Sequence, residues 1–81
     1  MGQETVLKRA VTRAGGPSAV ARAFGISPVS VGEWIKKDDL PAPRILPLAA
    51  LTQWEFTPHM LNSDLYPNVS DGLPKPEQVA A

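Results

Sequence analysis

The ten residues GISPVSVGEW, Gly25 to Trp34, decide how this chain folds. Ser27 is a residue type that caps helix N-termini, because its side-chain oxygen accepts a hydrogen bond from an N–H group of the first turn. Pro28 suits the position that follows, since the first helical residue needs no N–H donor. The stretch therefore predicts a turn at Gly25 and a helix that begins at Pro28 and extends past Trp34.

The residues before this turn predict a second short helix, so that the two form a helix-turn-helix motif over residues 17–36. The segment PSAVARAF begins with proline and stops at glycine, and its expected inner side is Ala19, Val20, Ala23 and Phe24. The motif crosses its helices at roughly 90–120°, which requires a small residue at the crossing, a turn residue that tolerates positive φ and inward anchors on the second helix. The residues that meet these requirements are Ala21, Gly25, Ile26, Val31 and Trp34.

The sequence on either side of the motif predicts two further helices. Apolar residues at helical spacing over residues 4–14 stop at Gly15–Gly16, where glycine accepts the left-handed conformation of a C-cap. A fourth helix through Leu48 to Leu51 begins at Pro43 or at Pro47. A proline inside a helix removes a hydrogen bond, so these two starts remain alternatives.

The last third of the chain predicts a short fifth helix and a tail. The pair Thr57–Pro58 repeats the cap-and-proline signal before the segment HMLNSDL. Residues 67–81, PNVSDGLPKPEQVAA, are rich in proline, glycine and polar residues, and we expect a flexible tail there. The predicted fold is therefore all-α, with a five-helix domain over residues 1–66 and no strand.

The composition excludes several classes of function. A chain of 81 residues has no room for a large catalytic cavity beside its core, so we expect no enzyme and no small-molecule substrate. It has no cysteine and one histidine, His59, which predicts no metal site and no cofactor. No apolar run approaches membrane-spanning length and no signal segment is visible, so we expect a cytoplasmic protein without a membrane partner.

The net charge is zero, but it is unevenly distributed. Residues 1–44 hold seven basic and four acidic residues, a net charge of +3, whereas residues 45–81 hold one basic and four acidic residues, a net charge of −3. A basic first half is compatible with an electrostatic footprint for nucleic acid. Solvated charges that balance by chance explain the same numbers.

The order of three segments resembles a known family. These segments are GGPSAVARAFGIS followed by VGEW, then LPAPR, then TPHMLNSDLYP. They are similar to the short Cro-like and YdaS-like regulators of bacteriophages and prophages, over about residues 5–74. The resemblance implies a Cro/repressor-like fold, often dimeric, that binds double-stranded operator DNA in the bacterial host cell and acts as a transcriptional repressor.

The chain departs from the family pattern where DNA would be read. It has Pro28 and Glu33 where family members often have glutamine, Pro43 where glutamate is usual, and Asn62–Ser63 where Arg-Pro is common. In a helix-turn-helix the outward positions of the second helix, here residues 28–36, face the major groove. The candidates for base contacts are Ser27, Pro28, Val29, Gly32, Glu33 and Lys36.

Several of these candidates have two interpretations. Glu33 can accept from a cytosine amino group, or it can be a surface carboxylate that pairs with Lys37. Val29 can contact a thymine methyl group. Gly32 either allows a close approach to DNA or is a tolerated surface defect that costs roughly 1 kcal/mol of helix propensity.

Affinity is expected to come mainly from phosphate contacts. The candidate side chains are Arg22, Lys36, Lys37 and Arg44. The N-termini of the helix that begins at Pro17 and of the helix through Leu48 to Leu51 are candidates too, because their free N–H groups suit anions. The two lysines can instead compensate a helix dipole. Arg9 and Arg13 are expected on a solvated face of the first helix.

The main alternative is a protein-interaction module. The C-terminal half carries more apolar surface than it can easily hide, and the candidates for a homodimer or partner surface are Trp54, Leu65 and Tyr66. In that case the chain is an antirepressor or a toxin–antitoxin component. It would bind a repressor or a toxin through the same surface or through the helix-turn-helix.

Overall fold

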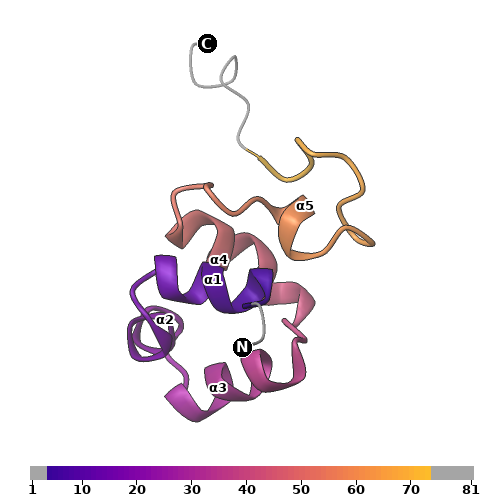
Figure 1. Cartoon of the computed structure of the whole chain (residues 1–81). Coiled ribbons are helices and arrows are strands. Elements are labelled where there is room, and N and C mark those ends of the chain that lie inside the picture. The colour runs from indigo at the N-terminus through magenta and orange to yellow at the C-terminus, as the bar shows by residue number, and fades with distance from the viewer. Residues whose placement is uncertain (1–3, 74–81) are drawn as a thin grey trace.

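The computed structural model describes residues 4–73, which are helical and connected by turns (Figure 1). The elements are α1 (Val6–Arg13), α2 (Pro17–Phe24), α3 (Pro28–Lys37), the 3-10 turn η1 (Ala42–Arg44), α4 (Ile45–Leu51) and α5 (Pro58–Leu61). The prediction of a small all-α, helix-turn-helix-like domain is confirmed. Within residues 4–73 no helix is long and apolar enough to cross a membrane.

Hydroxyl side chains begin three of the helices. Ser27 Oγ accepts from the N–H of Val29 at 3.1 Å, as predicted, and Pro28 is the first residue of α3. Thr57 Oγ1 caps α5 in the same way. Thr5 Oγ1 accepts from the N–H of Lys8, so α1 begins at Val6 rather than at residue 4.

The turn between α2 and α3 has the predicted geometry. Gly25 is left-handed, with φ of 70°, and the N–H of Ile26 donates to the carbonyl of Ala21 at 3.0 Å. Ala21 is only 2% exposed and Val31 is fully buried, while Ile26 packs against the core from the turn. Since α2 and α3 pack directly on each other, the small side chain of Ala21 allows their close approach.

The predicted inner side of α2 is wrong in part. Ala23 is exposed and Ala19 is only half-buried, whereas Val20 and Ala21 are buried. At 100° per residue, positions 20, 21 and 24 share one face and position 23 lies beside it. The inner side of α2 is therefore Val20, Ala21 and the partly buried Phe24.

The core lies where α1 crosses the other helices. α1 contacts α2, α3, α4 and α5. Its side chains Leu7, Ala10 and Val11 meet buried residues from the rest of the chain. These are Val20, Ala21, Val31, Trp34, Leu40, Ile45, Leu48 and Phe56.

The fourth helix begins at neither of the two predicted prolines. Pro43 lies in η1, α4 begins at Ile45, and Pro47 is its third residue. The first turn of a helix does not need all of its N–H groups for helical bonds, so Pro47 is accommodated there. The N–H of Ile45 donates to Ala42, and Pro47 has none, so this N-terminus is not the array of free donors that the sequence predicted for anions.

α4 ends in a turn without glycine. The N–H of Gln53 donates to Ala50 and that of Trp54 to Ala49, both at 2.9 Å, which is the double bond of a Schellman motif. Both residues have positive φ, 56° and 66°. The buried hydroxyl of Thr52 donates to Ala49 and accepts from the N–H of Phe56, so it fixes the chain that follows.

The predicted fifth helix over HMLNSDL is too long, because α5 stops at Leu61. Asn62 is extended and its side-chain Oδ1 accepts from the N–H groups of Asp64 and Leu65, at 3.0 and 3.1 Å. This local bonding competes with the helix, as asparagine often does. His59 Nδ1–H donates to the carbonyl of Tyr66 at 2.8 Å, so the histidine closes the turn.

The predicted tail, residues 67–81, divides into two parts. In the first part, the N–H of Asn68 donates to the carboxylate of Asp71 and the N–H of Asp71 donates to the carbonyl of Asn68. Gly72 lies so close to α4 and α5 that a Cβ there would be 2.9 Å from Pro58 and 3.0 Å from Leu46. Gly72 therefore contacts the domain, and residues 74–81 lie outside the described residues.

Arg13 is not simply solvated, because it forms a bidentate pair with Glu55. Its Nε–H and Nη2–H groups each donate to a different carboxylate oxygen at 2.8 Å. The hydrogen bond with the guanidinium lowers the pKa of Glu55 and the same bond raises the pKa of Arg13. The pair ties the end of α1 to the turn after α4, 42 residues later.

This pair predicts a stability change in acid. Because the folded-state pKa of Glu55 lies below its unfolded value, its contribution is present above the unfolded pKa and is lost as pH falls through the folded one. We expect the thermal midpoint to fall over that acid range, and Glu55→Gln to remove this part of the decrease. The control is Arg13→Gln, which should change the acid dependence of the thermal midpoint as Glu55→Gln does. The double variant should show no larger change than either single variant. An unchanged acid profile in Glu55→Gln would contradict the assignment.

Candidate nucleic-acid interface

The outer face of α3 carries the predicted base-contact residues. Val31 and Trp34 point into the core, which turns Pro28, Val29, Gly32, Glu33 and Lys36 outward, and all of these are exposed. Val29 is 71% exposed. α3 lies at one edge of the molecule, so this side of the helix is uncovered (Figure 1). The structure thus brings the predicted candidates together on one surface.

Two of the candidates already have a partner within the chain. Ser27 Oγ accepts the capping bond of α3. Its hydroxyl can still donate to a phosphate or base. The carboxylate of Glu33 lies 3.6 Å from Lys37 Nζ, so the surface pair considered as the alternative is present. A base contact by Glu33 remains a prediction.

Gly32 has no structural reason to be glycine. A Cβ built there meets no atom within 4 Å, and the residue is helical. Glycine in a helix interior lowers helix stability by roughly 1 kcal/mol relative to alanine, and Gly32 gives no gain in packing to offset this loss. Both interpretations of Gly32 remain: close approach by another molecule, or a tolerated surface defect.

The predicted phosphate contacts lie on α2, α3 and η1. Lys36 and Lys37 lie in its last turn, and Arg22 is exposed in the last turn of α2. Arg44 is half-buried, with its guanidinium 5.2 Å from the centre of the Phe24 ring, which in turn lies 6.3 Å from the Trp34 ring. The N-terminus of α2 begins with Pro17, which has no N–H, and no side chain caps it, so only the N–H groups of Ser18 and Ala19 remain as donors there.

The comparison with protein families decides the family. The family described as Bacterial toxin YdaS matches residues 7–70, which run from α1 to the turn after α5. This chain belongs to the YdaS family. Comparison with curated proteins and with solved structures yields no significant match. The YdaS part of the resemblance is confirmed, and the Cro-like part remains a prediction.

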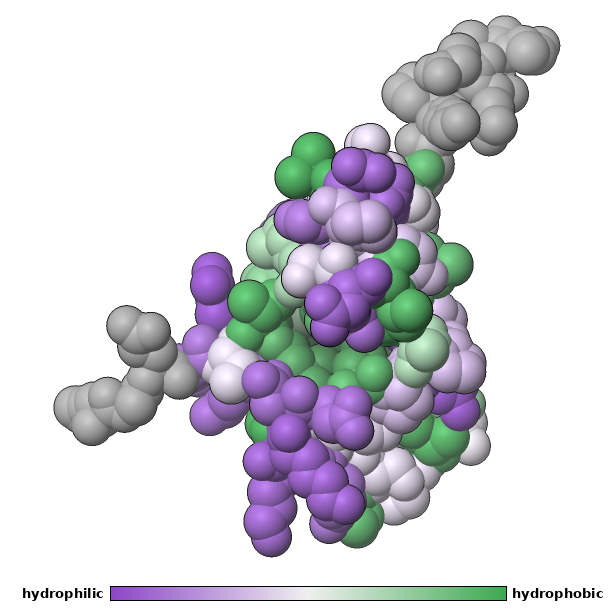
Figure 2. Space-filling model, turned by 90° about the vertical axis from the view of Figure 1, so that its right-hand side faces the viewer, coloured by the Kyte–Doolittle hydropathy of each residue, from purple (hydrophilic) through white to green (hydrophobic). Residues whose placement is uncertain are grey.

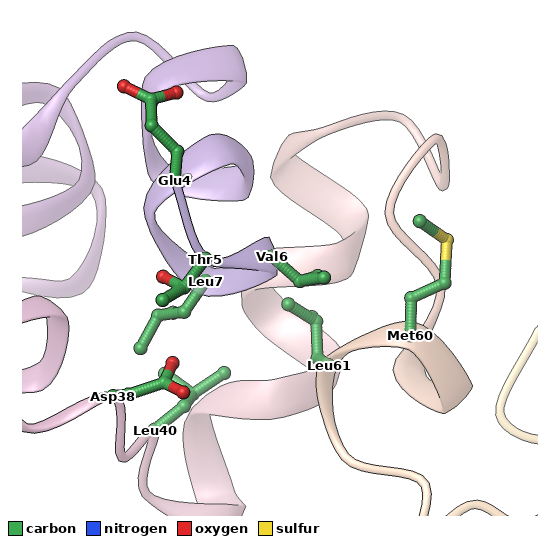
Figure 3. A pocket seen from close by; sticks show the side chains of 8 residues that line it. All are labelled: Glu4, Thr5, Val6, Leu7, Asp38, Leu40, Met60 and Leu61. Carbon is green, nitrogen blue, oxygen red and sulfur yellow. The ribbon is translucent and has the colours of Figure 1, made fainter. Parts of the chain in front are cut away.

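The YdaS-family domain has a second face that suits nucleic acid poorly. Figure 2 shows apolar side chains gathered in the middle of a face and polar ones around them. A hollow of about 420 Å³ is lined there by Glu4, Thr5, Val6, Leu7, Asp38, Leu40, Met60 and Leu61. Val6 and Leu61 point toward one another across it, and Asp38 lies beside Leu40 (Figure 3). Its two charged side chains are carboxylates, which repel phosphates.

The three residues predicted for a dimer or partner surface differ in how exposed they are. Leu65 is 55% exposed, whereas Trp54 and Tyr66 are half-buried. Tyr66 packs against the core of the YdaS-family domain. Met60, in α5, is 44% exposed. Leu65 is therefore the one of the three whose side chain is mostly free in the described part of the chain.

Proposed function

We propose that this YdaS-family chain is a double-stranded DNA-binding transcriptional regulator that reads an operator with α3. The observation that carries the proposal is the helix crossing at Ala21, Gly25 and Val31, which leaves one side of α3 outward and uncovered. A helix held in this way fits the major groove. By the family resemblance we extend the proposal to a repressor that binds its operator as a homodimer assembled on the DNA.

Phosphate contacts provide most of the affinity in this account. Lys36 is exposed on α3, Arg22 is exposed in the last turn of α2, and Arg44 is held against Phe24. We expect few contacts with the bases, because the side chain of Val29 is apolar and Gly32 has no side chain. We therefore expect strong salt dependence and modest sequence discrimination.

A protein partner is the second candidate function, and the family's description as a bacterial toxin favours it. The pairing of Glu33 with Lys37 and the exposure of Val29 make the outer face of α3 less basic and more apolar than a typical DNA-reading helix. Binding to a protein through this face would change little with salt, whereas binding to DNA weakens steeply.

Lys36→Ala is expected to lower DNA affinity for all sequences alike and to reduce the salt slope by about 1, because it removes one phosphate contact. Titration of labelled duplexes at several salt concentrations measures both effects. The matched control is Lys8→Ala, which removes a cation of α1 that pairs with Glu4. Equal effects of the two substitutions, or a slope unchanged by Lys36→Ala, would contradict the placement of DNA on α3.

A further inference from the structure

A groove beside α3 has an apolar lining and one cation. It measures about 510 Å³ and is lined by Ile26, Ser30, Trp34, Pro41, Pro43 and Arg44. Arg44 lies over the ring of Phe24 and has no ion-pair partner among residues 4–73. Such a groove fits an apolar side chain that lies next to a carboxylate.

The chain carries that pair of groups in a fixed turn. Leu65 is 55% exposed, and its neighbour Asp64 is exposed without an ion-pair partner in the described part of the chain. The side-chain Oδ1 of Asn62 accepts from the N–H groups of Asp64 and Leu65, and its carbonyl accepts from the N–H of Tyr66. The turn is therefore ordered before any contact forms, which lowers the entropic cost of docking.

The groove and the turn cannot meet within one copy. The groove lies between α3 and η1, and the turn follows α5, toward the other end of the molecule (Figure 1). The two halves of the sequence also differ in charge, with +3 over residues 1–44 and −3 over residues 45–81. The other hollow does not suit the turn, because Glu4 and Asp38 line it and would repel Asp64.

We propose that copies of this chain associate head to tail, with Leu65 of one copy in the groove between α3 and η1 of the next and Asp64 beside Arg44. The contact is heterologous, so a row of copies keeps a free groove at one end and a free turn at the other. Longer rows therefore form as the protein concentration rises. A single side chain and one ion pair make a small contact, so association is weak, at roughly 0.1 mM to 1 mM. The proposal concerns the protein without DNA and does not depend on the proposed function.

Sedimentation equilibrium of the full chain without DNA tests this proposal. We expect the average mass to rise beyond two chains as concentration increases at low salt, and to rise less at high salt. Leu65→Ser and Arg44→Glu should each remain monomeric. Val69→Ser, at another exposed apolar residue, is the matched control and should associate like the original chain.

Mixing the two inactive variants gives the sharpest result. Arg44→Glu keeps an intact turn and Leu65→Ser keeps an intact groove, so the mixture should form a one-to-one heterodimer that grows no further. Circular dichroism verifies folding, and Ser30→Glu replaces Arg44→Glu if that variant loses helicity, since Ser30 is exposed and lines the same groove. A chain that is monomeric at all concentrations, or one that stops at a dimer while the variants do not pair in the mixture, would overturn the proposal.

Discussion

Trp34→Ala is expected to lower the free energy of unfolding by about 4 kcal/mol, as removal of a large buried aromatic side chain does. Trp34 is 9% exposed and belongs to the buried core around α1. Its ring also lies beside Phe24, which supports Arg44. The substitution therefore removes core packing and the support of a predicted phosphate contact together. Urea unfolding followed by circular dichroism measures the loss.

The second tryptophan is the matched control for this substitution. Trp54 is half-buried and lies outside the core cluster. Its positive φ is equally unfavourable for tryptophan and alanine. We expect Trp54→Ala to cost less than about 1 kcal/mol. A loss as large as that of Trp34→Ala would show that the core is assigned to the wrong tryptophan.

Ala21→Leu is expected to lower the free energy of unfolding by about 3 kcal/mol, because added methyl groups overpack a closed crossing. Ala21 is 2% exposed and lies between α2 and α3. The larger side chain must separate the two helices, so DNA binding is lost with stability. A domain of this size has only roughly 5 kcal/mol to lose, and the loss of helical circular dichroism on mild heating is the readout.

Ala23→Leu is the control for the crossing. Ala23 lies in the same helix but is exposed, so leucine there should change stability by less than about 0.5 kcal/mol. If Ala21→Leu were as stable as Ala23→Leu, the helices would not cross at Ala21. The motif assignment would then be wrong.

The parts of the fold that depend on neighbouring residues were predictable from the sequence. Ser27 caps α3 and Gly25 takes the left-handed conformation, because each acts within one turn of its own position. The same signals at Thr57–Pro58 located the start of α5. Caps and turns involve few residues, so the types of those residues are sufficient to indicate them.

Two features were missed, one where neighbouring signals compete and one where no glycine marks a turn. Asn62 bonds to the N–H groups after it and ends α5 early, although the apolar pattern continued to Leu65. The turn at Gln53 and Trp54 adopts positive φ without glycine, so nothing in the residue types indicated it. It is specified by the buried hydroxyl of Thr52, which only the packed structure reveals.

The candidate site was predictable as a face but not as a set of contacts. Helical periodicity placed Val29, Gly32 and Lys36 together on the outside of α3. The contact of Arg44 with Phe24 and the pair of Arg13 with Glu55 join residues far apart in the chain. Such contacts depend on how the helices pack, and a single sequence does not specify that packing residue by residue.

Binding of the purified chain to duplex DNA from upstream of its own gene, at about 50 mM and about 200 mM salt, tests whether α3 reads an operator. Three phosphate contacts for each chain, and therefore six for a dimer on its operator, predict specific binding that weakens roughly 1,000-fold between these concentrations. Unrelated duplexes should bind more weakly at both. Absence of binding at low salt, by a protein whose circular dichroism is helical, would contradict the regulator account and direct attention to a protein partner.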